Sequence, residues 1–333
     1  MYCLGCYKKT GKPLCIKCSK TLFEGAKVPF ELDFDAPKAN NAELQNNTKK
    51  MSIPGVQLKY SLHLKGDKLA LTPKNGQFIL KPIPPIRYLD AIEDVPENEH
   101  LTMQIAAQVF KMDTAHNGII YFRDKEPAYI TKRFDVKADG SKYLQEDFAQ
   151  LLARTEDTDG PDYKFEGSYE AIGRFIKKNV AAYQPELEKL FKIIVFNYVV
   201  SNGDAHLKNF SLLKLDNGEY RLTPAYDLLC TVLHTNYESD TALDLYEDSL
   251  DSPFYSVYGY YGRPDFLELA RRLGILEKRA IKIIDSFIRS EPLVKSFIER
   301  SQLTKASKGK YLYKLADKTS RLKPRMDKNP PVA

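Results

Sequence analysis

The chain has 333 residues, which predicts about two domains or one large two-lobed unit at roughly 150 residues per domain. Hydrophobic residues make up 43% of it and aromatic residues 11%, enough to bury a sizeable core, so wholesale disorder is excluded. The net charge of +6 is too mild to indicate a nucleic-acid partner, and no run of about 18 apolar residues is present that would span a membrane.

Residues 1–30 are expected to form a small module rich in cysteine and lysine. Cys3 and Cys6 form one CxxC pair, and Cys15 and Cys18 form a second. Four converging thiolates suit tetrahedral zinc, so we expect a structural Zn²⁺ site, closed to catalysis because no ligand position stays open. The alternative is four reduced thiols in a frayed N-terminus. This clustering differs from a secreted disulfide scaffold, and the first ten residues contain no apolar signal-peptide core, so we expect a cytoplasmic protein.

The next part of the chain predicts a linker followed by a strand-rich lobe. Residues 31–50 are treated as the linker because most of them are polar and rich in asparagine. Residues 51–136 alternate short apolar runs with turn residues. We expect them to form, in chain order, a hairpin over 60–72, a strand ending at Lys81, a helix over 99–110 and a second hairpin over 118–132.

Residues 137–304 predict a helical lobe. Pro185 fits the first position of a helix whose apolar residues recur at helical spacing up to Val199, and Asn202 and Gly203 end it. A tight hairpin follows around residues 216–218, and three helices are expected over 264–274, 277–288 and 291–299.

Residues 305–333 are expected to be a basic tail. Residues 301–333 contain nine Lys or Arg against two Asp, and residues 1–30 contain six Lys against one Glu. The positive charge therefore belongs to the two ends of the chain, where we expect it to keep them solvated. This distribution argues against direct nucleic-acid binding.

The most informative segment is a polar loop between the long helix and the hairpin. Asp204 and Asn209 are five residues apart, the spacing of a kinase catalytic loop. The hairpin that follows can return Asp227 to the side of Asn209, and a carboxylate with an amide oxygen suits Mg²⁺. The alternative is a solvated polar turn, because Asn, Gly and Asp are ordinary turn formers.

Two upstream features favour phosphoryl transfer. Lys81 ends a strand and Glu99 follows 18 residues later on a helix, as in the lysine–glutamate pair by which kinases hold nucleotide phosphates. Residues 52–59 contain a glycine before a strand and can present backbone N–H groups to phosphate. Each feature alone has another interpretation. Lys81 could be a solubilising lysine on an edge strand, and Glu99 a first-turn residue stabilised by the helix dipole. Residues 52–59 could be a surface turn.

Taken together, these residues resemble the HipA family of bacterial serine/threonine kinases. The resemblance covers about residues 50–300. Its motifs are SIPGVQLK, FILKP, ENE, ITKRFD, LQEDF, NGDAHLKN and LTPAYD. It implies an α+β fold of the bilobal protein-kinase-like type, similar also to phosphoinositide kinases.

The resemblance also implies roles for individual residues. Asp204 is similar to the family's catalytic base, Asn209 and Asp227 to its Mg²⁺ ligands, and Lys81 to its phosphate-binding lysine, with Glu99 as the ion-pair partner. Ser52 occupies the place of the autophosphorylated serine, where two added negative charges would repel ATP; the alternative is a solvated hydroxyl. The remaining residues implied to bind ATP are Pro54, Gly55, Val56, Gln57, Leu58 and Lys59 in the loop, Lys132, Arg133 and Phe134 at the hinge, and His206, Lys208 and Tyr226 near the phosphates and metal.

Partners are implied in the same way. HipA kinases act as toxins on protein substrates such as aminoacyl-tRNA synthetases, and a small helix-turn-helix antitoxin accompanies them. Full-length members carry a longer strand-rich region before the SIPG-like loop, so this chain resembles split forms in which that region is a separate antitoxin protein. Two other interpretations stay open: a small-molecule phosphotransferase, and a catalytically silent kinase-like binding module.

Overall fold

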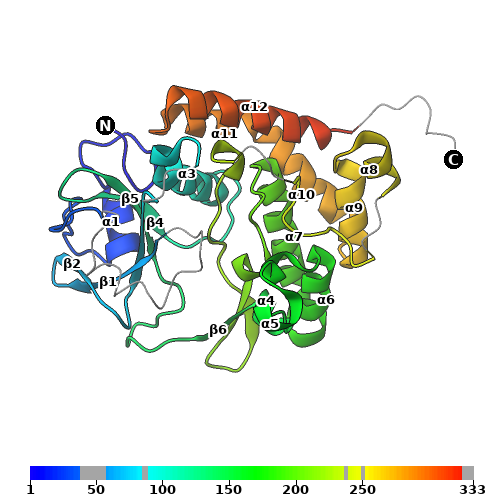
Figure 1. Cartoon of the computed structure of the whole chain (residues 1–333), viewed down its shortest axis with the longest axis horizontal. Helices are drawn as coiled ribbons and strands as arrows, with labels where there is room; N and C mark the ends of the chain where they lie inside the picture. The colour runs from blue at the N-terminus through cyan, green and yellow to red at the C-terminus, as the bar shows by residue number, and fades with distance from the viewer. Residues whose placement is uncertain (38–57, 85–88, 236–238, 249–251, 325–333) are drawn as a thin grey trace.

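The computed structural model describes residues 1–37, 58–84, 89–235, 239–248 and 252–324. Two lobes lie side by side, a sheet lobe and a helical lobe, with α3 between them (Figure 1). The sheet lobe contains α1 (Ile16–Phe23), β1 (Tyr60–Lys65), β2 (Lys68–Leu71), β3 (Phe78–Pro82), α3 (Val95–Gln108), β4 (Asn117–Tyr121) and β5 (Pro127–Lys132). The helical lobe contains β6 (Leu144–Asp147), α4 (Phe148–Leu151), α5 (Glu156–Asp159), α6 (Tyr169–Asn179), α7 (Tyr183–Val199), β7 (Ser211–Lys214), β8 (Tyr220–Leu222), α8 (Pro253–Tyr258), α9 (Arg263–Arg272), α10 (Glu277–Arg289), α11 (Glu291–Arg300) and α12 (Lys305–Arg321).

The first lobe is built on an antiparallel sheet of five strands in the order β2-β1-β3-β5-β4. Both predicted hairpins are confirmed, β1 with β2 and β4 with β5. The first hairpin turns at Gly66, whose φ of +60° is a conformation that glycine adopts at little cost. β3 is the central strand, paired with β1 up to Leu80 and with β5 on its other side, where Lys81 lies opposite Tyr129.

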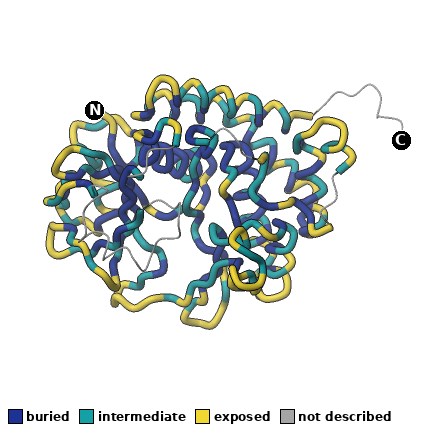
Figure 2. Tube along the Cα trace, in the orientation of Figure 1, coloured by how far each residue is buried: buried dark blue, intermediate teal, exposed yellow. Residues whose placement is uncertain are grey.

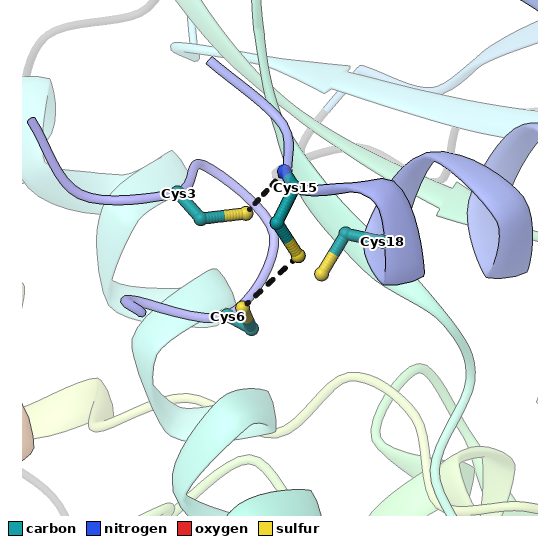
Figure 3. Close-up of side chains that lie close together, drawn as sticks. All are labelled: Cys3, Cys6, Cys15 and Cys18. Atoms are coloured by element: carbon teal, nitrogen blue, oxygen red, sulfur yellow. Dashed lines mark hydrogen bonds between the residues drawn. The ribbon is translucent and has the colours of Figure 1, made fainter. Parts of the chain in front are cut away.

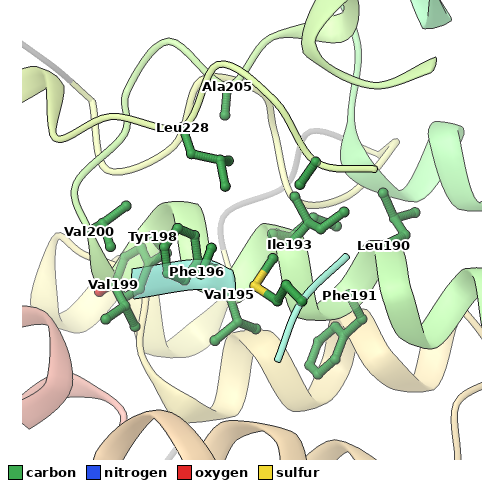
Figure 4. Packing of buried hydrophobic residues seen from close by; sticks show 14 of the residues in the cluster. Leu190, Phe191, Ile193, Val195, Phe196, Tyr198, Val199, Val200, Ala205 and Leu228 are labelled. Atoms are coloured by element: carbon green, nitrogen blue, oxygen red, sulfur yellow. The ribbon is translucent and has the colours of Figure 1, made fainter. Parts of the chain in front are cut away.

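The second lobe is organised around α7, as the apolar spacing predicts. Its residues Leu190, Phe191, Val195 and Phe196 are fully buried, and helices α6, α10 and α12 pack against it (Figure 4). A three-stranded sheet, β6-β7-β8, joins β6, which precedes α7, to the two strands that follow it, and β7 with β8 forms the predicted hairpin. The three later helices are confirmed as α9, α10 and α11.

Two helices begin earlier than the sequence predicts. α3 begins at Val95, so Glu99 lies in its second turn; Pro96 occupies the first turn, where a missing backbone N–H costs nothing. α7 begins at Tyr183, which makes Pro185 its third residue.

Part of the expected basic tail is a packed helix. Residues 305–321 form α12, which is buried on its inner side and exposed on its outer side (Figure 2). Tyr311 and Leu315 are fully buried, and the ammonium group of Lys318 pairs with Asp240 and lies over a tyrosine ring of α7. The expectation of a solvated tail is therefore wrong for residues 305–321, because apolar residues at i, i+4 spacing are interleaved with the lysines. No helix among the described residues is long and apolar enough to cross a membrane.

The carboxylate of Glu97 on α3 lies where the two lobes and the N-terminal module meet. Its Oε1 accepts hydrogen bonds from the Tyr7 hydroxyl at 2.8 Å and from the backbone N–H of Gln302, after α11, at 2.6 Å. Burial raises the pKa of Glu97 to about 7; Asp94 also raises it, while these hydrogen bonds and Lys308 lower it.

This raised pKa predicts a pH-dependent stability. The unfolded chain releases the Glu97 proton near pH 4.5 and the folded chain near pH 7, so the folded state binds more protons between these values. Stability is therefore lost as the pH rises through this window, by about 3 kcal/mol at 1.36 kcal/mol per pKa unit. Glu97→Gln should remove this loss. In urea titrations, the free energy of unfolding of the variant should therefore rise relative to that of the parent as the pH increases from about 4.5 to about 8. A constant difference across this range would show that Glu97 does not titrate as stated.

Candidate active site

The loop after α7 is held by its own side chains. The chain turns at Ser201, whose φ is +55°. The side-chain amide of Asn202 donates to Asn197 Oδ1 at 2.9 Å and to the carbonyl of Asp227 at 3.4 Å, and the N–H of Gly203 donates to Thr231 Oγ1 at 2.8 Å. These bonds fix the loop and the segment after β8 relative to one another.

Lys81 joins two carboxylates that come from distant parts of the chain. Its Nζ lies 2.5 Å from Glu99 Oε1 and 2.5 Å from Asp227 Oδ1, and its side chain is 5% exposed. Burial lowers the pKa of Lys81, but the charges of Asp227 and Glu99 outweigh this and raise it above its ordinary value. Lys81 is therefore a buried, charged ammonium group where both lobes meet, and the predicted Lys81–Glu99 pair is confirmed as a contact.

Asp227 is the acidic centre of this cluster. Its Oδ2 lies 3.4 Å from Lys59 Nζ and 3.5 Å from Asn209 Nδ2. Burial raises its pKa, but Lys59 and Lys81 outweigh burial and hold the pKa well below its usual range, so Asp227 is ionised. Its φ of +54° is uncommon outside glycine, and such strain is concentrated at functional sites.

Asp204 faces the same cleft but is more open. Its side chain is 52% exposed, and its Oδ1 lies 4.0 Å from Lys164 Nζ and 3.8 Å from His206 Nε2. Desolvation by the cleft walls raises the pKa of Asp204, while Lys164 lowers it. Partial exposure leaves this carboxylate accessible to a reacting group, as a general base requires.

Hydrogen bonds hold the loop around Asn209 and the segment just before Asp227. The backbone N–H of His206 donates to Asn209 Oδ1 at 3.2 Å, and burial lowers the pKa of the His206 imidazole to about 3, so it is neutral. The Tyr226 hydroxyl donates to the carbonyl of Lys208 at 2.9 Å and also lies 2.6 Å from a serine hydroxyl of β7. Tyr226 therefore ties the segment before Asp227 to the loop.

Together these side chains line a cleft of about 790 Å³ between the lobes. It combines ammonium groups of Lys59, Lys81, Lys164 and Lys208 with the oxygen donors of Asn209 and Asp227. Carboxylate and amide oxygens suit a hard cation such as Mg²⁺, and ammonium groups suit phosphate. The donor set therefore fits a nucleotide–metal complex.

The three predicted hinge residues do not line this cleft. Lys132 Nζ lies 2.6 Å from Glu24 Oε1, and Arg133 forms two hydrogen bonds with Asp135. Phe134 lies closer to the site, because its ring packs against the ring of Tyr226 with centroids 5.6 Å apart. The structure thus brings Phe134 beside the cleft and directs the side chains of Lys132 and Arg133 to other partners.

Part of the predicted phosphate loop lies outside the described residues, namely Ser52, Pro54, Gly55, Val56 and Gln57. Leu58 is partly buried against the core of the sheet lobe, and Lys59 reaches Asp227.

Sequence reasoning did not assign roles to two further charged residues of the cleft. Lys164, in the short turn before α6, faces Asp204. Asp147 caps α4 and lies 3.4 Å from Lys208 Nζ. Asp147 belongs to the LQEDF motif, which is a usable signal, whereas nothing in the sequence around Lys164 marks it.

The four N-terminal cysteines come together in a separate cluster (Figure 3). The sulfur atoms of the four cysteines lie within 4.8 Å of one another, and none of these cysteines is in a disulfide. They are Cys3, Cys6, Cys15 and Cys18. Hydrogen bonds from the thiols of Cys18 and Cys6, with smaller contributions from backbone N–H groups, hold the pKa of the Cys3 thiol well below its usual range. The arrangement expected of the two CxxC pairs is present.

Two lobes with a buried lysine–glutamate pair and an Asp–Asn loop between them define a bilobal fold of the protein-kinase-like class. Residues 51–292 match the family model of the HipA-like C-terminal domain, so the chain belongs to this family of HipA-like kinases. The resemblance found in the sequence motifs is thereby confirmed.

Individual relatives agree with this assignment. A Haemophilus influenzae protein described as a candidate kinase is 29% identical over 268 residues, covering 75% of this chain and 76% of that protein. The serine/threonine-protein kinase toxin HipA of Shewanella oneidensis is 24% identical over 235 residues, and the match covers 66% of this chain but only 51% of that protein. The solved structure of the Shewanella oneidensis toxin–antitoxin complex of HipA, HipB and operator DNA matches with a TM-score of 0.61 at 21% identity, covering 82% of this chain and 65% of that chain.

Proposed function

We propose that this chain is an ATP- and Mg²⁺-dependent kinase that phosphorylates serine or threonine hydroxyls of proteins. The observation that carries the proposal is Lys81, which contacts Glu99 of α3 and Asp227 of the loop segment in one buried cluster. This contact links the sheet lobe to the metal-ligand candidates, as phosphate positioning requires.

Each cleft residue has a role in this proposal. Asp204 would orient the substrate hydroxyl and accept its proton, because it is partly exposed and lies on the same loop as Asn209. Asn209 and Asp227 would hold Mg²⁺, which when bound supplies charge neutralisation for the transferred phosphoryl group. Lys81 and Lys59 would bind phosphate oxygens, and Phe134 with Tyr226 offers an aromatic edge near the hinge.

A toxin role is the second part of the proposal. The relatives' names include a serine/threonine-protein kinase toxin and a complex with an antitoxin and operator DNA. We propose that this chain acts in the cytoplasm on a translation-related protein such as an aminoacyl-tRNA synthetase, and that an antitoxin protein restrains it. The antitoxin would be a helix-turn-helix protein or a separate counterpart of the HipA N-terminal region. Phosphorylation of Ser52 would add close to two negative charges beside the phosphate site and oppose ATP binding.

The four-cysteine cluster supports a second metal, a structural zinc. With four thiolate ligands it would have no open coordination position and would take no part in phosphoryl transfer.

One experiment separates this function from its two alternatives. The purified chain is incubated with γ-labelled ATP, Mg²⁺ and a bacterial lysate, and the products are resolved by gel electrophoresis and by thin-layer chromatography. Label on discrete protein bands is expected. Label only on small molecules would identify a small-molecule phosphotransferase, and ATP binding without transfer to any product would identify a binding module.

A further inference from the structure

The N-terminal module contacts the hydrophobic cores of both lobes. Tyr7 is buried in the large core of the helical lobe and packs edge-on against Phe297 of α11, with ring centroids 6.1 Å apart. Leu22 and Phe23 of α1 are buried in the core of the sheet lobe. A segment of fewer than 30 residues thus inserts side chains into two separate cores.

The two insertion points lie in different halves of the module. Tyr7 directly follows Cys6 in the turn that holds the first CxxC pair, residues 3–7, which we call the first knuckle. Leu22 lies one helical turn after Cys18 on α1. α1 has eight residues and no side-chain cap at its N-terminus, and a helix this short is marginal alone. Tyr7 also has a φ of +57°, which a bulky side chain keeps only where its surroundings enforce it. A cross-link between the two halves would therefore stabilise both positions.

The sulfur geometry fits such a cross-link. Four thiolates at about 2.3 Å from a tetrahedral zinc stand about 3.8 Å from one another. The sulfurs of Cys6 and Cys15, one from each pair, are 3.8 Å apart (Figure 3). The backbone N–H groups of Gly5 and Cys15 donate to the sulfur of Cys3 at 3.4 and 3.2 Å, and such donors stabilise a thiolate.

The surroundings fit the charge of a four-thiolate zinc centre, which is −2. Cys6, Cys15 and Cys18 line a hollow of about 1290 Å³ whose other side chains include Lys8, Lys9, Lys12, Lys17 and Lys111. No acidic side chain is among the described residues that line it.

The first knuckle is also bound to α3. The Tyr7 hydroxyl donates to Glu97, and the side-chain amide of Gln108 donates to the carbonyl of Cys6 at 3.0 Å. These contacts lie near the two ends of α3, the helix that presents Glu99 to Lys81. Glu97 and Glu99 are separated by one residue. A movement of the first knuckle would therefore displace Glu99 and change its contact with Lys81.

We propose that one zinc ion bound by Cys3, Cys6, Cys15 and Cys18 staples the two lobes together, by fixing the Tyr7 knuckle to α1 and thereby holding α3 in place. The metal site stands independently of the kinase activity. Only the consequence for Lys81 and Glu99 rests on the proposed function.

The metal is tested first, on the full-length chain purified under reducing conditions. Elemental analysis should find about one zinc ion per chain, and Co²⁺ substituted for it should give the strong visible absorption of a tetrahedral thiolate site. Gly5→Ala should abolish this binding, because an added Cβ would lie 2.8 Å from Cys18 Cβ and 3.0 Å from its sulfur. Gly11→Ala is the matched control and should retain the metal, because its added Cβ meets no atom within 4 Å. A chain that takes up neither metal, or two variants that bind it equally, would overturn the site.

The staple is tested by hydrogen–deuterium exchange. Removing zinc with a chelator should speed exchange in residues 95–108 at least about tenfold, while residues 183–199 of α7 serve as the reference for global unfolding. Tyr7→Phe removes only the hydroxyl that donates a hydrogen bond to Glu97, so it should keep the zinc and still speed exchange in α3. Unchanged exchange of α3 after zinc removal would refute the staple. These readouts require no catalysis, so they stay informative if the chain proves not to be a kinase.

Discussion

Asp204→Asn is expected to slow phosphoryl transfer about 10²- to 10⁴-fold, the range that a positioned general base supplies. The amide keeps the size of the carboxylate but cannot accept the substrate proton. The charged partners of the Asp204 carboxylate, His206 Nε2 and Lys164 Nζ, lie 3.8 and 4.0 Å away, and its side chain is 52% exposed, so folding should be unaffected. Single-turnover transfer of labelled phosphate, measured at saturating ATP, gives the rate directly.

A matched control is available in the β7–β8 turn. Asp216 pairs with Lys137 at the surface, far along the hairpin from the cleft, and its side chain is 70% exposed. Asp216→Asn makes the same chemical change and should leave the rate unchanged. If Asp204→Asn transfers phosphate as fast as the parent and the control, the assignment of Asp204 as the base fails.

Asp227→Asn is expected to abolish Mg²⁺-dependent nucleotide binding. Loss of a residue that only orients a metal ligand costs about 10- to 100-fold in affinity, so losing a charged ligand should cost at least that. Asparagine tolerates the left-handed backbone found at Asp227, so the effect would come from the lost charge. Calorimetric titration of ATP with Mg²⁺ and with EDTA measures both states.

The variant also removes the anion that Lys81 and Lys59 share. Binding of ATP in EDTA should therefore be preserved or strengthened while the effect of Mg²⁺ disappears. A variant that retains the full Mg²⁺ dependence would remove Asp227 from the metal site.

The elements that position this site were largely predictable from local sequence patterns. The apolar spacing of α7 and the turn residues at Asn202 and Gly203 place Asp204 on a loop, and the hairpin of β7 and β8 returns the chain toward Asp227. The Lys81–Glu99 contact was predicted from a strand lysine followed by a helical glutamate. The first of these predictions depends on secondary structure close in sequence, and the second on the lysine–glutamate pair of kinases.

The remaining features depend on tertiary contacts that no local pattern encodes. Lys164 reaches Asp204 only because the turn before α6 folds over the loop, and Lys132 turns to Glu24 of the N-terminal module. α12 was mistaken for a solvated tail because its lysines dominate the composition, although Tyr311 supplies a buried contact to α3. The burial of Tyr7 in the core of the helical lobe was likewise not visible in the cysteine spacing that predicts the module.

Transfer of phosphate from ATP to protein hydroxyls through Asp204 is open to a direct test by phosphoproteomics. The parent and Asp204→Asn are each expressed at equal levels in bacterial cells, and phosphorylated serine and threonine sites are quantified across the proteome. Discrete sites should appear with the parent and be absent with the variant. Identical phosphoproteomes for the two proteins would contradict transfer through Asp204.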